Sequence, residues 1–306
     1  MKILASGMSG LIGSALRPEL EKRSYEIVRL KTGTARQPNE IAWEPLRPLD
    51  AAQVSGFDAV IHLAGENIFG RWTKRKKKSI YESRVLGTRH LCAALAACAS
   101  KPKVLLAASA VGFYGSHHDE LLTEASANGK GFLADLAWDW EAATEPARRA
   151  GIRVVNLRSG IVLSRQGGAL AMMLPIFRLG LGGKIGSGKQ WMSWIAIEDE
   201  VAAILFCLDH EEISGPVNLA APNPVTNADF ALTLARAVHR PAFFGVPEVA
   251  VRLLLGSEMA EETVLASQRV APEKLQRAGF EFKFATLADA LRVHHRDTEV
   301  ILVKIL

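Results

Sequence analysis

The sequence predicts an α/β fold in which a doubly wound parallel sheet is joined to a small, mostly helical C-terminal lobe. Three observations support this prediction: short apolar runs alternate with helical patterns, a glycine-rich turn follows the first apolar run, and the alternation stops after about residue 163. Strands that alternate with helices form a parallel sheet covered on both faces. Right-handed crossovers make such a sheet doubly wound and place ligands at the carboxyl ends of its strands.

Each expected strand is a short, mainly apolar run bounded by polar residues or glycine. The expected strands are Lys2–Ala5, Glu26–Leu30, Ala59–Leu63, Lys103–Ala108, Arg153–Leu157 and Val217–Leu219. The expected helices between them are Leu11–Arg23, Arg75–Ala99 and Phe132–Ala150. Helical patterns that predict the C-terminal lobe cover Asn227–Val238, Pro247–Leu255 and a closing segment near Leu287–Val293.

The composition is that of a soluble globular protein, with 49% hydrophobic and 23% charged residues among 306. No apolar run reaches the roughly 18 residues of a membrane span, so we expect a cytoplasmic protein without a membrane partner. The cysteines Cys92, Cys98 and Cys207 lack metal-ligand spacing and are expected to be buried, reduced thiols. The adjacent His117 and His118 also lack that spacing, and no metal site is expected.

Much of the formal net charge of +5 comes from one basic run, Lys74–Lys78. We expect this run to be the solvated face of a helix, and attraction of an anionic cofactor or substrate is the alternative. No recognition motif or interleaved aromatic residues accompany the run, so nucleic acid is not an expected partner.

Three glycines spaced three apart, Gly7, Gly10 and Gly13, lie between the first expected strand and the first expected helix. Glycine permits the tight turn after the strand, the approach of backbone N–H groups to a diphosphate, and close packing of the helix on the strand. The helix N-terminus favours an anion at the same place. A purely structural turn is the alternative. The predicted dinucleotide contacts here are Gly7, Ser9, Gly10, Leu11, Ile12 and Gly13.

The end of the second expected strand predicts which nicotinamide dinucleotide binds. A carboxylate there would bind a ribose 2′-hydroxyl, whereas a cation accommodates a 2′-phosphate. The strand ends in Lys31 and Thr32, with Arg36 nearby and no carboxylate. These residues favour NADP(H) through charge-assisted contacts, and the alternative is that Lys31 is an ordinary exposed lysine.

The third expected strand runs into a small and then polar segment at its carboxyl end. Ala64 and Gly65 let the backbone approach the ribose and phosphates of the cofactor, and His62 inside the strand is expected to be a packed core histidine. The expected cofactor or ligand contacts of this segment are Leu63, Ala64, Gly65, Glu66, Asn67 and Arg71.

Glycine-rich and tryptophan-rich segments between residues 167 and 194 interrupt the alternation of strands and helices. We interpret them as loops that form a lid over the substrate, and packing between lobes is the alternative.

The residues of several segments resemble one family over nearly the whole chain. The segments are Gly7–Gly13, Val60–Ile68, Gly70–Thr73, Ser83–Thr88, Ser109–Gly115, Leu157–Gly160, Gly186–Ile195, Ser267–Val270 and Ala278–Phe280. The chain resembles the atypical, extended short-chain dehydrogenase/reductases, in the sugar-nucleotide-epimerase-like branch with a characteristic C-terminal domain of unknown function. The resemblance implies a Rossmann-type fold, NADP binding and oxidoreductase or epimerase activity.

The resemblance also indicates the domain organisation. We expect an NADP-binding Rossmann domain over residues 1–165, with its sheet completed by residues 210–222. Substrate loops and a small C-terminal domain are expected over residues 166–306.

The chain departs from the wider superfamily where the superfamily carries its catalytic residues. A Tyr-x-x-x-Lys pair exchanges a proton with the substrate in the superfamily, and here Phe132 and Leu136 stand at those positions. Arg84 and Ala196 replace an asparagine and a histidine that are usual in the family.

Two residues remain as candidates for catalysis. Ser109 follows the expected strand 103–108 and is expected either to bond a substrate carbonyl or hydroxyl or to bond within the strand end. Tyr114 is either a proton donor or a packed loop aromatic.

Two functions follow. The first is an NADP(H)-dependent oxidoreductase or epimerase that acts on a nucleotide sugar or small carbonyl compound. The second is an NADP-binding regulatory or interaction protein that has lost catalysis, which the missing Tyr and Lys favour. The sequence leaves the oligomeric state open, with a homodimer as one option.

Overall fold

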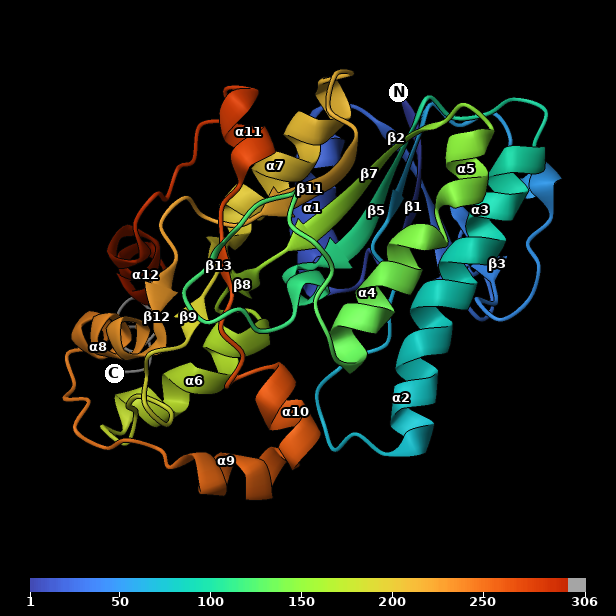
Figure 1. Cartoon of the computed structure of the whole chain (residues 1–306). Coiled ribbons are helices and arrows are strands. Elements are labelled where there is room, and N and C mark those ends of the chain that lie inside the picture. The colour runs from blue at the N-terminus through green and yellow to red at the C-terminus, as the bar shows by residue number, and fades with distance from the viewer. Residues whose placement is uncertain (297–306) are drawn as a thin grey trace. The chain divides into compact units, whose positions relative to one another are not determined.

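A seven-stranded sheet is formed by strands that lie between Lys2 and Leu219 (Figure 1). Its strands are β1 (Lys2–Ser6), β2 (Glu26–Thr32), β3 (Glu40–Trp43), β4 (Ala59–His62), β5 (Val104–Ala110), β7 (Arg153–Ser159) and β11 (Gly215–Leu219). They lie in the order β3-β2-β1-β4-β5-β7-β11, and the pairs from β3 to β5 are parallel. The order reverses between β1 and β4, which is where a doubly wound sheet binds its ligands. The predicted fold class is confirmed.

This computed structural model describes residues 1–296, and the chain divides into two compact units. Unit 1 consists of Met1–Phe113, Gly131–Arg158 and Val201–Val217. Unit 2 consists of Tyr114–Lys130, Ser159–Glu200 and the residues from Asn218 onward. The domain boundary expected near residue 165 stays a prediction, and the two units are described separately.

The helices of unit 1 follow the expected pattern, with a π-helical turn inside one expected helix and a break in another. They are α1 (Leu11–Lys22), α2 (Lys74–Tyr81), α3 (Gly87–Ala97), α4 (Phe132–Ala142) and α5 (Glu145–Arg149). A π-helical turn, Glu82–Leu86, joins α2 to α3, so the expected helix 75–99 is continuous but changes its winding. Residues 143 and 144 separate α4 from α5, because Pro146 near the start of α5 has no N–H that could continue the helical hydrogen bonds of α4.

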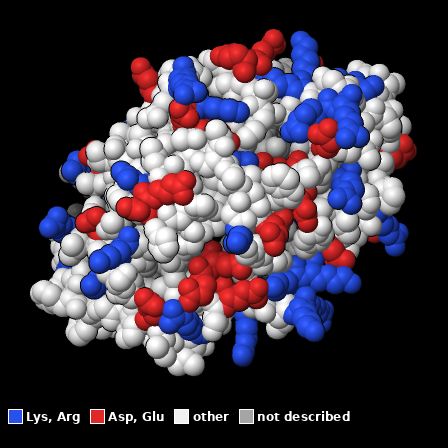
Figure 2. Space-filling view, viewed as in Figure 1, with Lys and Arg blue, Asp and Glu red and all other residues white. Residues whose placement is uncertain are grey.

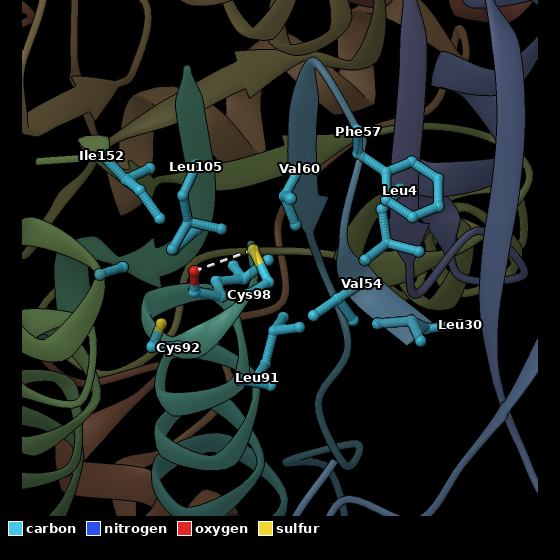
Figure 3. Close-up of a cluster of buried hydrophobic side chains, with 14 of the residues drawn as sticks. Leu4, Leu30, Val54, Phe57, Val60, Leu91, Cys92, Cys98, Leu105 and Ile152 are labelled. Carbon is cyan, nitrogen blue, oxygen red and sulfur yellow. Dashed lines mark hydrogen bonds between the residues drawn. The ribbon is translucent and has the colours of Figure 1, made fainter. Parts of the chain in front are cut away.

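The core of unit 1 joins the sheet to α3. Leu4, Val60 and Leu105 from β1, β4 and β5 meet Leu91 and Cys98 in one buried cluster (Figure 3). All three cysteines are free and buried, as expected, and burial raises the pKa of the Cys92 thiol to about 12. Apolar packing against α3 therefore fixes the strands β1, β4 and β5, whose carboxyl ends lead to the site.

Unit 2 contains short strands and the C-terminal helices. The strands are β6 (Leu121–Leu122), β8 (Ile161–Leu163), β9 (Trp191–Met192), β10 (Trp194–Ala196), β12 (Val225–Thr226) and β13 (Arg269–Val270). The helices are α6 (Gly168–Arg178), α8 (Asn227–Ala237), α9 (Glu248–Leu255), α10 (Ser257–Glu262), α11 (Glu273–Arg277) and α12 (Leu287–Arg296). Its core includes Trp194, Phe230, Leu234 and Leu291, which are all buried.

Several elements were not expected from the sequence, among them β3, α6 and α7 (Ile197–Asp209). The strand β3 has only four residues and begins at a glutamate, so its apolar signal is short. The helix α6 starts beside Gly167 and contains Pro175, and both residue types usually interrupt helices. The helix α7 has three carboxylates in its first turn, Glu198, Asp199 and Glu200, which suit the helix dipole.

Within residues 1–296, no helix combines the length and apolar character needed to cross a lipid bilayer.

Candidate functional site

The glycine turn between β1 and α1 forms a tight backbone cradle. Gly7 has φ +73°, and a Cβ on it would lie 2.5 Å from the carbonyl carbon of Leu63, just beyond β4. A Cβ on Gly13 would lie 2.3 Å from the carbonyl oxygen of Gly7. Both distances are too short for a side chain, so glycine is required at these two positions. The cradle brings the carboxyl ends of β1 and β4 together.

The N-terminus of α1 at this cradle has no side-chain cap in the described chain. Its N-cap residue, Gly10, has no side chain to cap the helix, and the first turn contains no acidic residue. Ser9 and Gly10 are both exposed. The first N–H groups of a helix have no partner within it, and together with the helix dipole they bind anions. The cradle therefore fits the diphosphate of a dinucleotide.

The segment that follows β4 is held from below by the π-helical turn. The Glu66 N–H donates to Ser83 Oγ at 3.0 Å, and Arg84 Nη1 donates to the Glu66 carbonyl oxygen at 2.7 Å. Burial lowers the pKa of Arg84 to about 10, against the opposing effect of Glu66. Ala64 is half-buried and Gly65 is exposed. These two hydrogen bonds fix the peptide groups of Glu66 beside the cradle, while Gly65 and Glu66 remain exposed to solvent.

The remaining predicted contacts after β4 differ in their exposure. Leu63 is half-buried, and its N–H donates to the Ser6 carbonyl at 3.2 Å, which extends the pairing of β4 with β1. The Glu66 carboxylate pairs with Lys76 Nζ at 2.7 Å, and Asn67 and Arg71 are exposed.

The end of β2 differs from the sequence interpretation in one respect. No carboxylate follows β2 along the chain, but β3 places Glu40 opposite Arg29 in the parallel register. Glu40 Oε2 lies 3.4 Å from Lys31 Nζ, and Glu40 Oε1 lies 2.8 Å from Arg29 Nη2. Thr32 is exposed at the strand end. The sequence reading missed this carboxylate because β3 was not expected.

Ser109 lies near the end of β5 and bonds to a buried ion pair. Ser109 Oγ donates to Glu141 Oε1 of α4 at 2.7 Å. Arg158 at the end of β7 grips the same carboxylate with Nε on Oε1 at 2.7 Å and Nη2 on Oε2 at 2.8 Å. The Arg158 guanidinium also lies 3.5 Å from the centroid of the Phe113 ring. The hydroxyl hydrogen of Ser109 is therefore engaged, and its oxygen lone pairs are left to accept.

The positions of the superfamily Tyr and Lys belong to an apolar cluster. Leu136 is buried with Ile80 and Trp140, and Phe132 packs edge-to-face on Trp72 with ring centroids 5.1 Å apart. Neither Phe132 nor Leu136 can transfer a proton, in agreement with the departure seen in the sequence.

Tyr114 belongs to unit 2, whereas Ser109 belongs to unit 1. The Tyr114 side chain is fully buried, and its hydroxyl donates to Asn218 Oδ1 at 2.6 Å. This environment favours the packed aromatic among the two alternatives, and a role in proton donation stays a prediction.

His62 is the core histidine that the sequence suggested. It is fully buried, with Nδ1 at 2.6 Å from Ser6 Oγ and Nε2 at 3.0 Å from Thr88 Oγ1. Burial lowers the pKa of His62 to about 4, so the ring is neutral at physiological pH.

The basic run lies on α2 and is largely solvated. Figure 2 shows Lys and Arg side chains gathered around the position of α2, and Lys74, Arg75 and Lys78 are exposed there. The Thr73 side chain caps the helix by accepting from the Lys76 N–H. The expected solvated helix face is confirmed.

The segments interpreted as a lid are built into unit 2. Trp194 is fully buried and its Nε1 donates to the Asn223 carbonyl at 3.1 Å, while the Arg269 guanidinium lies 4.6 Å from the centroid of the half-buried Trp191 ring. The lid function stays a prediction. No group of three or more metal-ligating side chains gathers in the part of the chain that the structure describes.

Sequence reasoning missed three polar residues that shape the site in unit 1. Glu40 contacts Lys31, Glu141 contacts Ser109, and Arg158 in turn holds Glu141. Glu141 lies in a helix that also contains Asp135 and Asp139, and Arg158 lies in a strand that also contains Arg153, so neither residue stood out in the sequence.

Comparisons with known proteins agree with this architecture. Residues 3–220 match the NAD dependent epimerase/dehydratase family, and residues 246–293 match a domain of unknown function, DUF1731. The epimerase family protein Mb2239 of Mycobacterium bovis is 44% identical over 291 residues, which cover 94% of this chain and 96% of that protein.

Two solved structures are similar over the whole chain. The crystal structure of human epimerase family protein SDR39U1 (isoform 2) with NADPH has a TM-score of 0.90 and 34% identity, covering 97% of this chain and 100% of that chain. The nucleoside-diphosphate sugar epimerase from Corynebacterium glutamicum has a TM-score of 0.80 and 34% identity, covering 100% of this chain and 61% of that chain. The family match, the identity to curated relatives and the sheet topology agree, and this chain belongs to the NAD dependent epimerase/dehydratase family.

Proposed function

We propose that this protein is an NADP(H)-dependent oxidoreductase or epimerase that acts on a small molecule carrying a hydroxyl or carbonyl group, such as a nucleotide sugar. The observation that carries the proposal is the cradle: Gly7 and Gly13 leave room for backbone only, and α1 offers an uncapped N-terminus free of carboxylates. A purely structural turn would not need an exposed, uncapped helix end. The human relative solved with NADPH supports the same cofactor class.

The cofactor contacts in this proposal are the residues named from the sequence. Backbone groups of residues 7–13 hold the diphosphate, and Lys31 with Thr32 at the end of β2 contacts the 2′-phosphate. The segment Leu63–Gly65 lies against the ribose, where Arg84 and Ser83 fix the neighbouring peptide group. When bound, NADP(H) supplies hydride transfer at its nicotinamide ring.

We assign to Ser109 the role of binding the substrate. Its hydrogen is engaged by Glu141, so Ser109 Oγ acts as an acceptor toward a substrate hydroxyl. Arg158 keeps Glu141 oriented through two hydrogen bonds, and Glu141 and Arg158 are positioning residues in this account. A substrate hydroxyl that donates to Ser109 is oriented by that hydrogen bond.

The test is turnover of NADPH or NADP with a panel of carbonyl compounds, alcohols and nucleotide sugars. We expect turnover with at least one class, and Ser109→Ala should lower kcat/KM by roughly tenfold or more while NADPH binding is retained. The matched control is Ser79→Ala on the exposed surface of α2, which should leave turnover unchanged. Absence of turnover across the panel, or equal turnover in Ser109→Ala, would contradict the assignment.

A second function is favoured by the apolar packing of Phe132 and Leu136 in α4. In that case the chain binds NADP(H) without catalysis and acts as a regulatory or interaction protein. A partner protein whose affinity changes between NADPH and NADP would support it. The same turnover panel separates the two functions.

The cytoplasm remains our expected compartment, and the homodimer remains open to measurement by sedimentation.

A further inference from the structure

The carboxylate of Glu40 lies among the cations at the end of β2. Its side chain is 3% exposed, although β3 is the edge strand of the sheet. It accepts from Arg29 Nη2 at 2.8 Å, from Lys31 Nζ at 3.4 Å and from the Arg36 N–H at 2.7 Å. Among these three donors, Lys31 is the residue assigned to the 2′-phosphate, and Arg36 lies in the loop that follows β2.

The three contacts of Glu40 differ in how easily a ligand can exchange them. Arg29 Nη2 has a second partner, Gln37 Oε1 at 2.8 Å, and it is mostly shielded from solvent. The Lys31 contact is the longest of the three, and 40% of that side chain is exposed. A bound phosphate would therefore draw on Lys31 first, while Arg29 and the Arg36 amide stay with Glu40.

The charge of Glu40 is stable in this setting. The hydrogen bond from the Arg36 amide, followed by Lys31 and Arg29, lowers the pKa of the Glu40 carboxyl. Glu40 is thus an anion at neutral pH, and it both competes for Lys31 and repels any second anion placed beside Lys31. A ribose 2′-hydroxyl has no charge and experiences neither effect.

We propose that Glu40 determines the selectivity of this chain between NADP(H) and NAD(H), because its carboxylate competes with the 2′-phosphate for Lys31 and weakens NADP(H) binding specifically. This inference rests on the proposed function and extends it to a residue on a strand that the glycine motif does not touch. No carboxylate follows β2 along the chain, but the pairing of β3 with β2 places the Glu40 carboxylate beside the end of β2.

The test compares the affinities of NADPH and NADH by isothermal titration calorimetry in the wild type, Glu40→Gln and Glu26→Gln. Glutamine keeps the shape and the acceptor for the Arg36 N–H but removes the charge. Glu26 lies at the opposite end of β2, where its carboxylate pairs with Lys2 at 3.5 Å, so Glu26→Gln is the matched control. Thermal unfolding verifies that each variant is folded.

We expect Glu40→Gln to bind NADPH about fivefold to tenfold more tightly at low salt and NADH with unchanged affinity, and Glu26→Gln to match the wild type. The gain should shrink as salt is raised, since it is electrostatic. Unchanged or weaker NADPH binding in a folded Glu40→Gln protein would overturn the inference. Equal tightening of NADPH and NADH would also overturn it.

A second variant covers the case in which Glu40→Gln does not fold. Glu40→Asp keeps the charge but withdraws it from Lys31, and we expect a smaller gain for NADPH in the same direction. Unchanged or weaker NADPH binding in Glu40→Asp would overturn the inference. Failure of the wild type to bind either dinucleotide is a different result, because it removes the proposed function itself.

Discussion

Two parts of unit 1 treat their polar groups in opposite ways. At the cradle between β1 and α1, Ser9 and Gly10 are exposed, and the first turn of α1 has no side-chain cap. At the end of β5, Ser109 is 5% exposed and is bonded to Glu141, which Arg158 holds in turn. The cradle offers donors that a ligand can take up directly, whereas the β5 end offers a hydroxyl whose hydrogen is already engaged.

The two regions differ in how much the protein must rearrange to bind a ligand. An unpaired helix N-terminus binds an anion without rearrangement of the protein. A serine held by a buried ion pair recognises only a group that donates to it, or else requires the pair to shift at a cost. A dinucleotide therefore binds at the cradle with less rearrangement of the protein than a substrate needs at Ser109.

The largest expected effect is on the ion pair. Glu141→Gln removes the carboxylate charge that lies against the buried Arg158 guanidinium, whose side chain is 4% exposed. We expect the free energy of unfolding to fall by about 3 kcal/mol, measured by urea denaturation. The matched control is Glu273→Gln, which breaks an exposed pair with Arg277 and should change stability by less than about 1 kcal/mol. Equal effects in the two variants would show that the Arg158 pair is not the firm support described above.

The second prediction concerns the cradle. Gly13→Ala places a methyl group 2.3 Å from the Gly7 carbonyl oxygen, so the turn must open. We expect NADPH affinity to fall by roughly 50-fold, measured by calorimetry on folded protein. Gly245→Ala is the control, because its methyl group would meet its nearest neighbour at 3.7 Å, an ordinary contact. Retained affinity in Gly13→Ala would mean that the dinucleotide does not bind at this turn.

The stability of unit 1 is expected to depend on pH through the buried His62. The pKa of His62 is lowered to about 4 in the folded protein, against about 6.5 when unfolded, so the unfolded state binds more protons below pH 6.5. The stability that neutral His62 contributes is present above pH 6.5 and is lost as the pH falls toward 4. We expect about 2 kcal/mol to be lost between pH 6.5 and pH 5, measured by urea denaturation.

The control for this pH effect is a pair of asparagine variants. His62→Asn should flatten the slope between pH 5 and pH 6.5, whereas His118→Asn in an exposed loop should keep it. An unchanged slope in His62→Asn would assign the acid sensitivity to other groups.

The sequence predicted the elements that have a strong local pattern. The glycine turn and the strands β1, β4, β5 and β7 lie within two residues of their expected bounds, because apolar runs between polar boundaries are local signals. The strand β3 was missed because it has only four residues and begins at a glutamate. The helix α7 was missed although its first turn contains three carboxylates, which are a helix-start signal.

The site residues that belong to a local pattern were likewise predicted, and those that reach the site through tertiary contacts were not. Gly7 and Gly13 were identified from spacing alone, since the turn is local. Glu40 reached Lys31 only through a sheet register, and Glu141 lies 32 residues from Ser109 along the chain. Tyr114 shows the converse: it is near Ser109 in sequence but belongs to the other unit. Tertiary contacts of this kind leave no periodic trace in the sequence.

The most direct measurement is hydrogen exchange of the backbone amides with and without NADPH. Our account predicts that NADPH slows exchange in residues 7–15 and 63–67, while the helix Glu248–Leu255 is unchanged. Unchanged exchange in the glycine turn at saturating NADPH, or protection confined to other segments, would contradict the claim that this turn holds the diphosphate.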